Sequence, residues 1–196
     1  MENVIIKSEL TCINTNVSYC TKKIASMYNK GINVLDYGLG SGRNVAHLLK
    51  SEYNVHGCDT LEQLTRQQAN HDILRQQGAT IDFCSNLPSE FYNVVLCSFV
   101  LNVIESDSIK LEVVQDLYNK QKKYGITYIE VRTDSDIKGA KTKEKYNNGY
   151  LIRKGKNYTY QEAISFEKLE KLVKKAGFKV GTHVCNSTKH YITLFK

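Results

Sequence analysis

The chain has 196 residues, of which 41% are hydrophobic and 24% are charged, and its formal net charge at pH 7 is +7. This length fits one domain with a sizeable core and is too short for two ordinary domains. The composition is that of a soluble globular protein. No apolar run approaches the roughly 20 residues that cross a bilayer, and residues 1–7 lack the basic-then-apolar layout of a signal peptide. We therefore expect a cytoplasmic protein with no membrane partner.

Neither the charge nor the cysteines indicate one particular ligand. A basic surface attracts nucleic acid, but a lysine-rich composition alone also gives a pI near 9.0. The six cysteines include no C-x-x-C pair, and four of them lie in apolar, strand-like runs. We therefore expect buried, reduced thiols rather than disulfides or zinc ligands. The five histidines show no metal-ligand spacing, so no metal site is predicted.

Strand-like and helix-like patterns alternate along the chain from about residue 33. The predicted strands are residues 33–36, 54–58, 81–84, 92–99, 127–132, 179–185 and 190–195. The predicted helices are residues 17–30, 45–50, 61–77, 108–123 and 166–176. Residues 1–30 thus form a helical lead-in, and 31–196 form a single domain. Residues 133–163, rich in lysine, glycine, asparagine and tyrosine, have no clean period and interrupt this domain as an insertion.

Alternation of strands and helices predicts an α/β fold with a mostly parallel sheet and helices on both of its faces. The last two strands are separated only by a short turn at Asn186 and Ser187, which indicates a hairpin. A hairpin reverses the chain, so the last strand is expected to run antiparallel to the rest.

The most informative segment is the junction between the first strand and the following helix. The strand ends at Asp36, and glycines follow at positions 38, 40 and 42. Glycines at such a junction let the backbone turn sharply and approach a ligand closely. A dinucleotide fingerprint needs its third glycine at position 43, where Arg43 stands. The carboxylate of Asp36 suits a ligand with an ammonium and a sulfonium better than a pyrophosphate, so an NAD-type oxidoreductase is disfavoured.

This pattern resembles motif I of the class I S-adenosylmethionine-dependent methyltransferases. The resemblance covers residues 33 to about 130 well and the closing hairpin loosely. It implies a Rossmann-like sheet of seven strands with an antiparallel last strand. It also implies S-adenosyl-L-methionine as the cofactor, with Gly38, Gly40 and Gly42 along its methionine part and Asp36 placing that part.

Two further contacts with the cofactor are predicted from the ends of the next strands. Asp59 ends the second strand, where a carboxylate can accept two hydrogen bonds from a ribose diol. Thr60 beside it is a further candidate cofactor contact, although Asp59 or Thr60 can instead cap the helix that begins near Leu61. Ser85 or Asn86, after the third strand, is placed to meet the adenine, although this segment can also be only a turn.

The segment Cys97–Ile104 occupies the place of motif IV, whose tip faces the methyl group in the family, and Ser98 is a candidate cofactor contact there. Asn102, Tyr160 and Gln161 are predicted to meet the methyl acceptor, but Asn102 can equally cap the strand-to-helix junction. The strings Val100–Ile104, Thr15–Ser18 and Thr159–Gln161 resemble a subgroup of small methyltransferases from phages and from bacterial mobile or defence-associated loci. The chain has neither the Asp/Asn-Pro-Pro-aromatic tetrad nor a Pro-Cys dipeptide, which disfavours amino-methylating DNA enzymes and C5-cytosine enzymes.

We predict transfer of a methyl group to an unidentified acceptor, a small molecule or a nucleic acid, by in-line displacement. The alternative is a non-catalytic S-adenosylmethionine-binding module that acts on a nucleic-acid or protein partner. Lysines and tyrosines interleave between Lys138 and Lys156. This segment is predicted either to close over the active site as a lid or to grip phosphates and stack bases.

Overall fold

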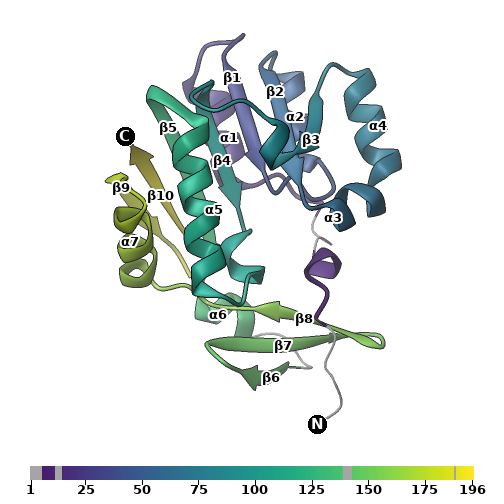
Figure 1. Ribbon diagram of the computed structural model, residues 1–196, viewed down its shortest axis with the longest axis vertical. Helices are drawn as coiled ribbons and strands as arrows, with labels where there is room; N and C mark the ends of the chain where they lie inside the picture. The colour runs from purple at the N-terminus through teal and green to yellow at the C-terminus, as the bar shows by residue number, and fades with distance from the viewer. Residues whose placement is uncertain (1–5, 12–14, 139–142, 188) are drawn as a thin grey trace.

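The computed structural model describes residues 6–11, 15–138, 143–187 and 189–196, and its central feature is a seven-stranded sheet (Figure 1). The strands lie in the order β3-β2-β1-β4-β5-β10-β9. β10 runs antiparallel to both β5 and β9, whereas the other neighbouring pairs are parallel. The strands are β1 (Asn33–Tyr37), β2 (Asn54–Asp59), β3 (Thr80–Phe83), β4 (Tyr92–Ser98), β5 (Gln121–Arg132), β9 (Lys179–Cys185) and β10 (Lys189–Phe195). This arrangement confirms the predicted fold class.

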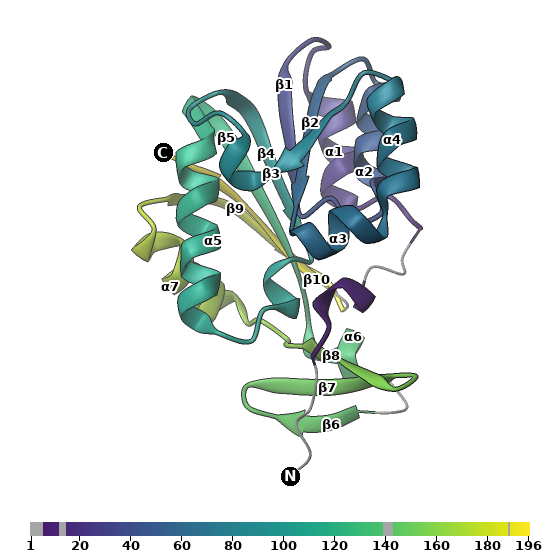
Figure 2. The same ribbon diagram turned by 45° about the vertical axis from the view of Figure 1, so that its right-hand side comes forward.

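Helices cover both faces of this sheet (Figures 1 and 2). One buried cluster joins the sheet to α5 and α7, and a second joins its other face to α1, α2 and α4. The main helices are α1 (Tyr19–Met27), α2 (Arg43–Lys50), α3 (Leu61–Arg66), α4 (Gln68–Gln76), α5 (Asp107–Lys120) and α7 (Phe166–Lys175). No helix in the described part of the chain is long and apolar enough to cross a membrane.

The two cores follow from the alternation of side chains along the central strands. Val34 and Val94 belong to the cluster under α1 and α2, whereas Leu35 and Val95 belong to the cluster under α5 and α7. Successive side chains of a strand point to opposite faces, so a strand covered on both faces is apolar throughout. β4, predicted as such a central strand, is buried at six of its seven positions.

Several boundaries differ from the predictions. The helix predicted over residues 61–77 is two helices that meet at Gln67. α5 ends at Lys120, and β5 begins at once with Gln121, six residues before the predicted strand. The buried Gln121 amide explains this early start, because it donates to the Gly125 carbonyl at 2.7 Å and accepts from the Thr127 hydroxyl at 2.6 Å.

The segment without a clean period contains a short helix and a second sheet. α6 (Asp134–Lys138) is followed by β6 (Lys143–Tyr146), β7 (Gly149–Lys154) and β8 (Asn157–Gln161), which form an antiparallel sheet in the order β6-β7-β8. Both views show this small sheet beyond one end of the main sheet (Figures 1 and 2). β6 is exposed or half-buried at all four positions, so it lacks the apolar alternation that predicts a strand.

The expectation that all cysteines are reduced is wrong for one pair. Cys58 and Cys84 form a disulfide with their Cα atoms 5.1 Å apart. The parallel register of β2 and β3 pairs Cys58 with Asp82, and this brings Cys84, two residues further on, beside Cys58. Cys20 and Cys97 are free and buried, whereas Cys185 is exposed. Cys12 lies outside the described residues.

Candidate functional site

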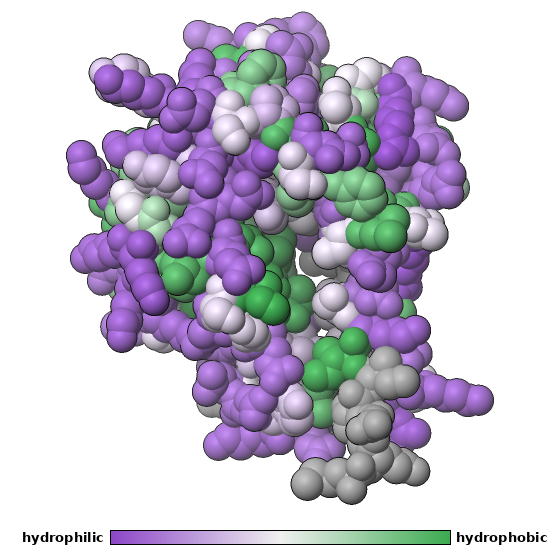
Figure 3. All heavy atoms as spheres, viewed as in Figure 1, coloured by the Kyte–Doolittle hydropathy of each residue, from purple (hydrophilic) through white to green (hydrophobic). Residues whose placement is uncertain are grey.

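A cavity of about 1350 Å³ lies at the carboxyl ends of β1, β2 and β4. The space-filling view shows the molecule hollowed in this region, with hydrophobic side chains along the side that α5 forms (Figure 3). The cavity exceeds the roughly 300–1,000 Å³ of pockets that hold one small ligand. The predicted site residues that line it are Gly38, Gly40, Asp59, Thr60, Ser85, Ser98, Tyr160 and Gln161. Asp36, Gly42 and Asn102 are not among the lining residues.

The glycine loop connects β1 to α2 and has left-handed backbone conformations at all three glycines. At Gly38, with φ of 76°, an added Cβ would overlap the side chain of Val100 in the motif IV segment. At Gly42, with φ of 82°, it would overlap Leu74 of α4. Gly38 therefore allows the loop to pack against motif IV, and Gly42 allows α4 to pack against the start of α2.

We expect Gly38→Ala to lower the free energy of unfolding by about 2–3 kcal/mol, because left-handed strain adds to the overlap with Val100. Urea unfolding followed by circular dichroism measures this change. Gly38→Ala combined with Val100→Ala should recover part of the loss, because the second substitution removes the overlapping methyl groups. Equal losses in the single and double variants would show that Val100 does not constrain the loop.

Asp59 holds the glycine loop from the end of β2. Its Oδ2 accepts a hydrogen bond from the Gly40 N–H and its Oδ1 accepts one from the Thr60 N–H, both at 2.8 Å. Burial raises the pKa of Asp59, and these two N–H groups oppose that rise by stabilising the carboxylate. The helix cap is Thr60, whose hydroxyl accepts from the Gln63 N–H at 3.4 Å. The Asp59 carboxylate is therefore not needed as the cap and lines the cavity.

Two residues that sequence reasoning missed also shape this end of the cavity. His71 of α4 is fully buried, and its Nε2 lies 2.8 Å from the Gly40 carbonyl oxygen. Gly40 is thus fixed through its N–H by Asp59 and through its carbonyl by His71. Gln63 lines the cavity and is only 3% exposed, and neither atom of its amide has a hydrogen-bond partner among the described residues.

Asp36 lies beneath the loop rather than in the cavity. It is fully buried, and its Oδ1 accepts a hydrogen bond from the Asn44 amide at 3.4 Å. Its Oδ2 has no hydrogen-bond partner among the described residues. Burial raises the pKa of Asp36 to about 7, although the Asn44 hydrogen bond and the Arg43 charge oppose this rise.

The raised pKa makes the stability of the unliganded protein depend on pH through Asp36. Its folded-state pKa of about 7 lies above the ordinary value of 3.8, so folding favours the protonated form. This contribution is fully present below about pH 4 and is lost as the pH rises through 7, by about 2–3 kcal/mol between pH 5 and pH 8. Asp36→Asn, which is neutral throughout, should remove this decline. Unfolding in urea at pH 5 and pH 8 tests it, and parallel declines in the parent and the variant would contradict it.

The motif IV segment is held by a buried polar group that connects four parts of the chain. The Ser98 hydroxyl lies 3.2 Å from Glu130 Oε2 on β5 and 3.1 Å from the Ser18 hydroxyl, which caps α1. Lys189 of β10 forms an ion pair with Glu130 at 3.0 Å. Phe99 follows Ser98 with an uncommon positive φ of 62°, and its N–H donates to the Glu130 carbonyl at 2.7 Å. These contacts fix Ser98 and Phe99 at the cavity wall.

Asn102 has a different place from the one predicted. It is fully buried, its amide nitrogen donates to the Glu162 carbonyl at 2.5 Å, and its Oδ1 accepts from the Arg132 N–H at 2.9 Å. The Glu162 N–H in turn donates to the Asn102 carbonyl at 2.8 Å. Both amide atoms are committed to backbone, so the structure does not support a contact between Asn102 and the acceptor. Asn102 instead joins motif IV to the ends of β5 and β8.

This connection places the end of β8 at the cavity. Tyr160 is fully buried and its hydroxyl donates to Glu162 Oε2 at 3.0 Å. Burial, and then the Glu162 charge, raise the pKa of Tyr160 well above its ordinary value. Glu162, only 2% exposed, also pairs with Lys110 of α5 at 2.6 Å and with Lys168 of α7 at 2.7 Å.

The segment before α1 closes another side of the cavity. η1 (Ser8–Thr11) and Ile6 contribute lining residues. The Lys7 N–H donates to the Tyr158 carbonyl of β8 at 2.8 Å, and Arg66 of α3 donates to the Glu9 carbonyl at 3.0 Å. Residues 6–11 thus form a strap between the small sheet and α3, which no pattern in the sequence predicts.

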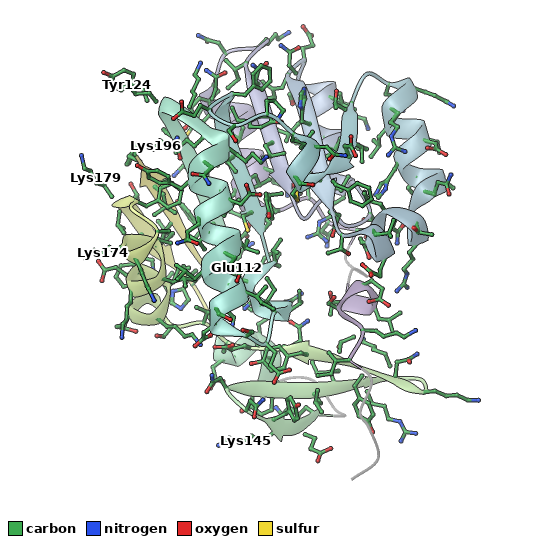
Figure 4. All side chains as sticks on the ribbon, in the orientation of Figure 1. Glu112, Tyr124, Lys145, Lys174, Lys179 and Lys196 are labelled. Atoms are coloured by element: carbon green, nitrogen blue, oxygen red, sulfur yellow. A yellow bond between two sulfur atoms is a disulfide. The ribbon has the colours of Figure 1, made fainter. Side chains whose placement is uncertain are left out.

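The basic residues of the insertion whose side chains the structure describes do not line the cavity. Lys145, Arg153 and Lys156 are exposed, and no described lysine is among the lining residues. Figure 4 shows Lys145 at the outer side of β6, away from α5. The insertion closes the cavity with β8 and with the turn at Asn147 and Asn148, whereas Lys145, Arg153 and Lys156 face the surroundings.

Comparison with known proteins identifies the family. A family model described as a methyltransferase domain matches residues 15–183. The chain belongs to this methyltransferase family. The match and the fold confirm the predicted class I superfamily and the prediction of a methyltransferase. No curated protein matches the sequence.

Solved methyltransferase structures share the fold at low sequence identity. A Methanosarcina mazei S-adenosylmethionine-dependent methyltransferase is 14% identical with a TM-score of 0.69, over 92% of this chain and 99% of its own. A Pyrococcus horikoshii protein is 14% identical with a TM-score of 0.72, over 94% of each chain. The 1,6-didemethyltoxoflavin N1-methyltransferase of Burkholderia thailandensis, solved with its substrate and S-adenosylhomocysteine, is 17% identical with a TM-score of 0.64, over 90% of this chain and 76% of its own. At these identities the likeness concerns the fold alone.

Proposed function

We propose that this methyltransferase transfers the methyl group of S-adenosylmethionine to an acceptor bound in the same cavity. The observation that carries the proposal is that one cavity is lined by the glycine loop, Asp59, Ser98 and the end of β8. Its volume of about 1350 Å³ leaves room for a second molecule beside a nucleoside cofactor. In-line displacement from a sulfonium depends mainly on alignment of the two reactants.

The roles of individual residues follow from their positions. The loop at Gly38 and Gly40, with Ser98, holds the methionine part, and Asp59 accepts the ribose hydroxyls with the lone pairs that Gly40 and Thr60 leave free. Thr60 and Ser85 line the adenine side. On the opposite side, Tyr160 and Gln161 contact the acceptor. Asn102 positions motif IV and β8. Asp36 lies beneath the glycine loop and contributes to cofactor binding by positioning that loop.

Binding and turnover are tested separately. Calorimetry should show one site for S-adenosylmethionine and S-adenosylhomocysteine, and no heat with NAD. If neither sulfur nucleoside binds, the proposal is overturned. If both bind but no tritiated methyl group is transferred to any fraction of a cell extract, the predicted non-catalytic binding module is the better description.

Three finer predictions remain proposals. Three short strings support the resemblance to small phage and defence-associated methyltransferases, and a cytoplasmic location rests on composition.

Contact of the exposed Lys145, Arg153 and Lys156 with nucleic acid would take place outside the cavity. Glutamate at these three positions should then abolish a salt-dependent affinity for an oligonucleotide without changing the affinity for S-adenosylhomocysteine.

A further inference from the structure

The half of the cavity away from the glycine loop has apolar walls. The aliphatic residues that line it come from the end of motif IV and from the face of α5 that is turned to the cavity: Val103, Ile104, Ile109 and Val113. Hydrophobic side chains lie along the same side of the hollow in the space-filling view (Figure 3). Such walls bury the carbon skeleton of a ligand and give no hydrogen bonds to phosphates or sugars.

The charge of this half is negative. Glu9 and Glu105 line the cavity, and so does Arg132, whose charge is offset by its ion pair with Asp136 and which packs over the Phe99 ring at 5.1 Å. Carboxylates beside an apolar wall favour a nitrogen base and repel phosphate groups. This property distinguishes the cavity from the basic outer surface of the small sheet.

The rim of this half is bridged on two sides. The strap at residues 6–11 is hydrogen-bonded to both β8 and α3. Across from it, the Asn147 amide donates to Glu105, joining the β6–β7 turn to the loop before α5. These bridges narrow the opening of this half, which favours a compact acceptor over a polymer strand.

Gln161, at the end of β8, supplies a polar group that can recognise a ligand in this half of the cavity. It lines the cavity, is only 7% exposed, and its Oε1 has no hydrogen-bond partner among the described residues. A buried acceptor without a donor is unfavourable. The terminal amide torsion of glutamine is broad, so a small rotation presents Oε1 to the cavity, where an N–H of the ligand satisfies it.

We infer that the methyl acceptor is a compact nitrogen base with an apolar skeleton and an N–H group that donates to Gln161, and this inference rests on the proposed function. The nitrogen lone pair forms a bond to the methyl carbon while the methyl–sulfur bond breaks and its electron pair goes to sulfur. The products are S-adenosylhomocysteine and the N-methylated base, whose N–H proton passes to water.

The test follows tritiated methyl groups from S-adenosylmethionine into three fractions of a cell extract: the ultrafiltrate below 3 kDa, the nucleic acid and the protein. Label is expected in the ultrafiltrate, in a product that enters organic solvent at pH 11 and not at pH 3. Label in nucleic acid or protein, or in a small product that is extracted at pH 3, overturns the inference. So does the absence of label while calorimetry shows that S-adenosylhomocysteine binds. If that nucleoside does not bind, the proposed function fails instead.

Substitutions test whether Gln161 and Glu105 contribute to recognition of the acceptor. Gln161→Met and Glu105→Gln should each lower the initial rate at limiting ultrafiltrate by about tenfold, while the affinity for S-adenosylhomocysteine changes less than twofold. Glu112→Gln is the matched control for Glu105→Gln, because Glu112 is an exposed glutamate of the adjoining helix α5 that does not line the cavity (Figure 4). Equal rates for Gln161→Met and Glu112→Gln would overturn the role of Gln161.

Discussion

Asp59→Ala is expected to weaken the binding of S-adenosylhomocysteine by about a hundredfold or more. Two backbone N–H groups that now donate to the carboxylate, those of Gly40 and Thr60, would lose their partner. Each hydrogen bond to a charged group contributes about 1.5–3 kcal/mol. The ribose hydroxyls would lose the same carboxylate, so the loop and the ligand are both affected. Isothermal titration calorimetry measures the dissociation constant directly.

Two further variants separate ligand binding from general loss of structure. Asp59→Asn keeps one carbonyl-type oxygen and should bind with intermediate affinity. Asp72→Ala, which removes an exposed ion pair with Arg75 on α4, should bind as the parent does. A folded Asp59→Ala protein with the affinity of the parent would remove Asp59 from the cofactor site.

The part of the site that could be predicted from the sequence is the part built from neighbouring residues. A strand, an acid, three glycines and a helix follow one another within residues 33–50, so their local conformations determine the loop. Asp59 could be placed because parallel strands bring their carboxyl ends to one edge of the sheet, and β1 pairs with β2 in that way.

The residues that sequence reasoning missed act across long separations. His71 meets Gly40 from 31 positions away, and the Cys58–Cys84 bond spans 26. The partners of Ser98 lie on β5 and before α1. Such contacts depend on how helices pack and on strand register, which periodicity does not specify. The small sheet was missed for another reason, since β6 has no buried position and the apolar residues of β7, Tyr150–Ile152, follow one another without alternating with polar ones.

The asparagine of motif IV shows how a local string can suggest the wrong contact. A polar residue after a buried strand is compatible both with acceptor binding and with a cap, and the sequence left both open. The structure shows a third arrangement, in which Asn102 binds the backbones of Glu162 and Arg132. The hydrogen bonds of Asn102 thus attach the insertion to motif IV. Through them, the acceptor half of the cavity at β8 is joined to the cofactor half at motif IV.

Lys110→Met is expected to lower the free energy of unfolding by about 3–5 kcal/mol, the range for breaking a buried ion pair from one side. Lys110 is fully buried, and its ammonium lies 2.6 Å from Glu162 and 2.9 Å from Asp107. Methionine fills a similar volume but leaves the Glu162 carboxylate, 2% exposed, with Lys168 and Tyr160 as its remaining partners. Urea unfolding measures the change.

Removing both charges distinguishes a more weakly paired buried carboxylate from a loss of packing. Lys110→Met with Glu162→Gln should be more stable than Lys110→Met alone, because the buried Glu162 charge, which then has only Lys168 as a cationic partner among the described residues, is also removed. Lys174→Ala, which breaks an exposed pair with Glu170, should cost less than about 1 kcal/mol. If the double variant is no more stable than Lys110→Met, the packing of the lysine stem is what matters. Lys110 is connected to Tyr160 on the acceptor side through Glu162, which also accepts from the Tyr160 hydroxyl. Lys110→Met should therefore slow methyl transfer while the affinity for S-adenosylhomocysteine changes little.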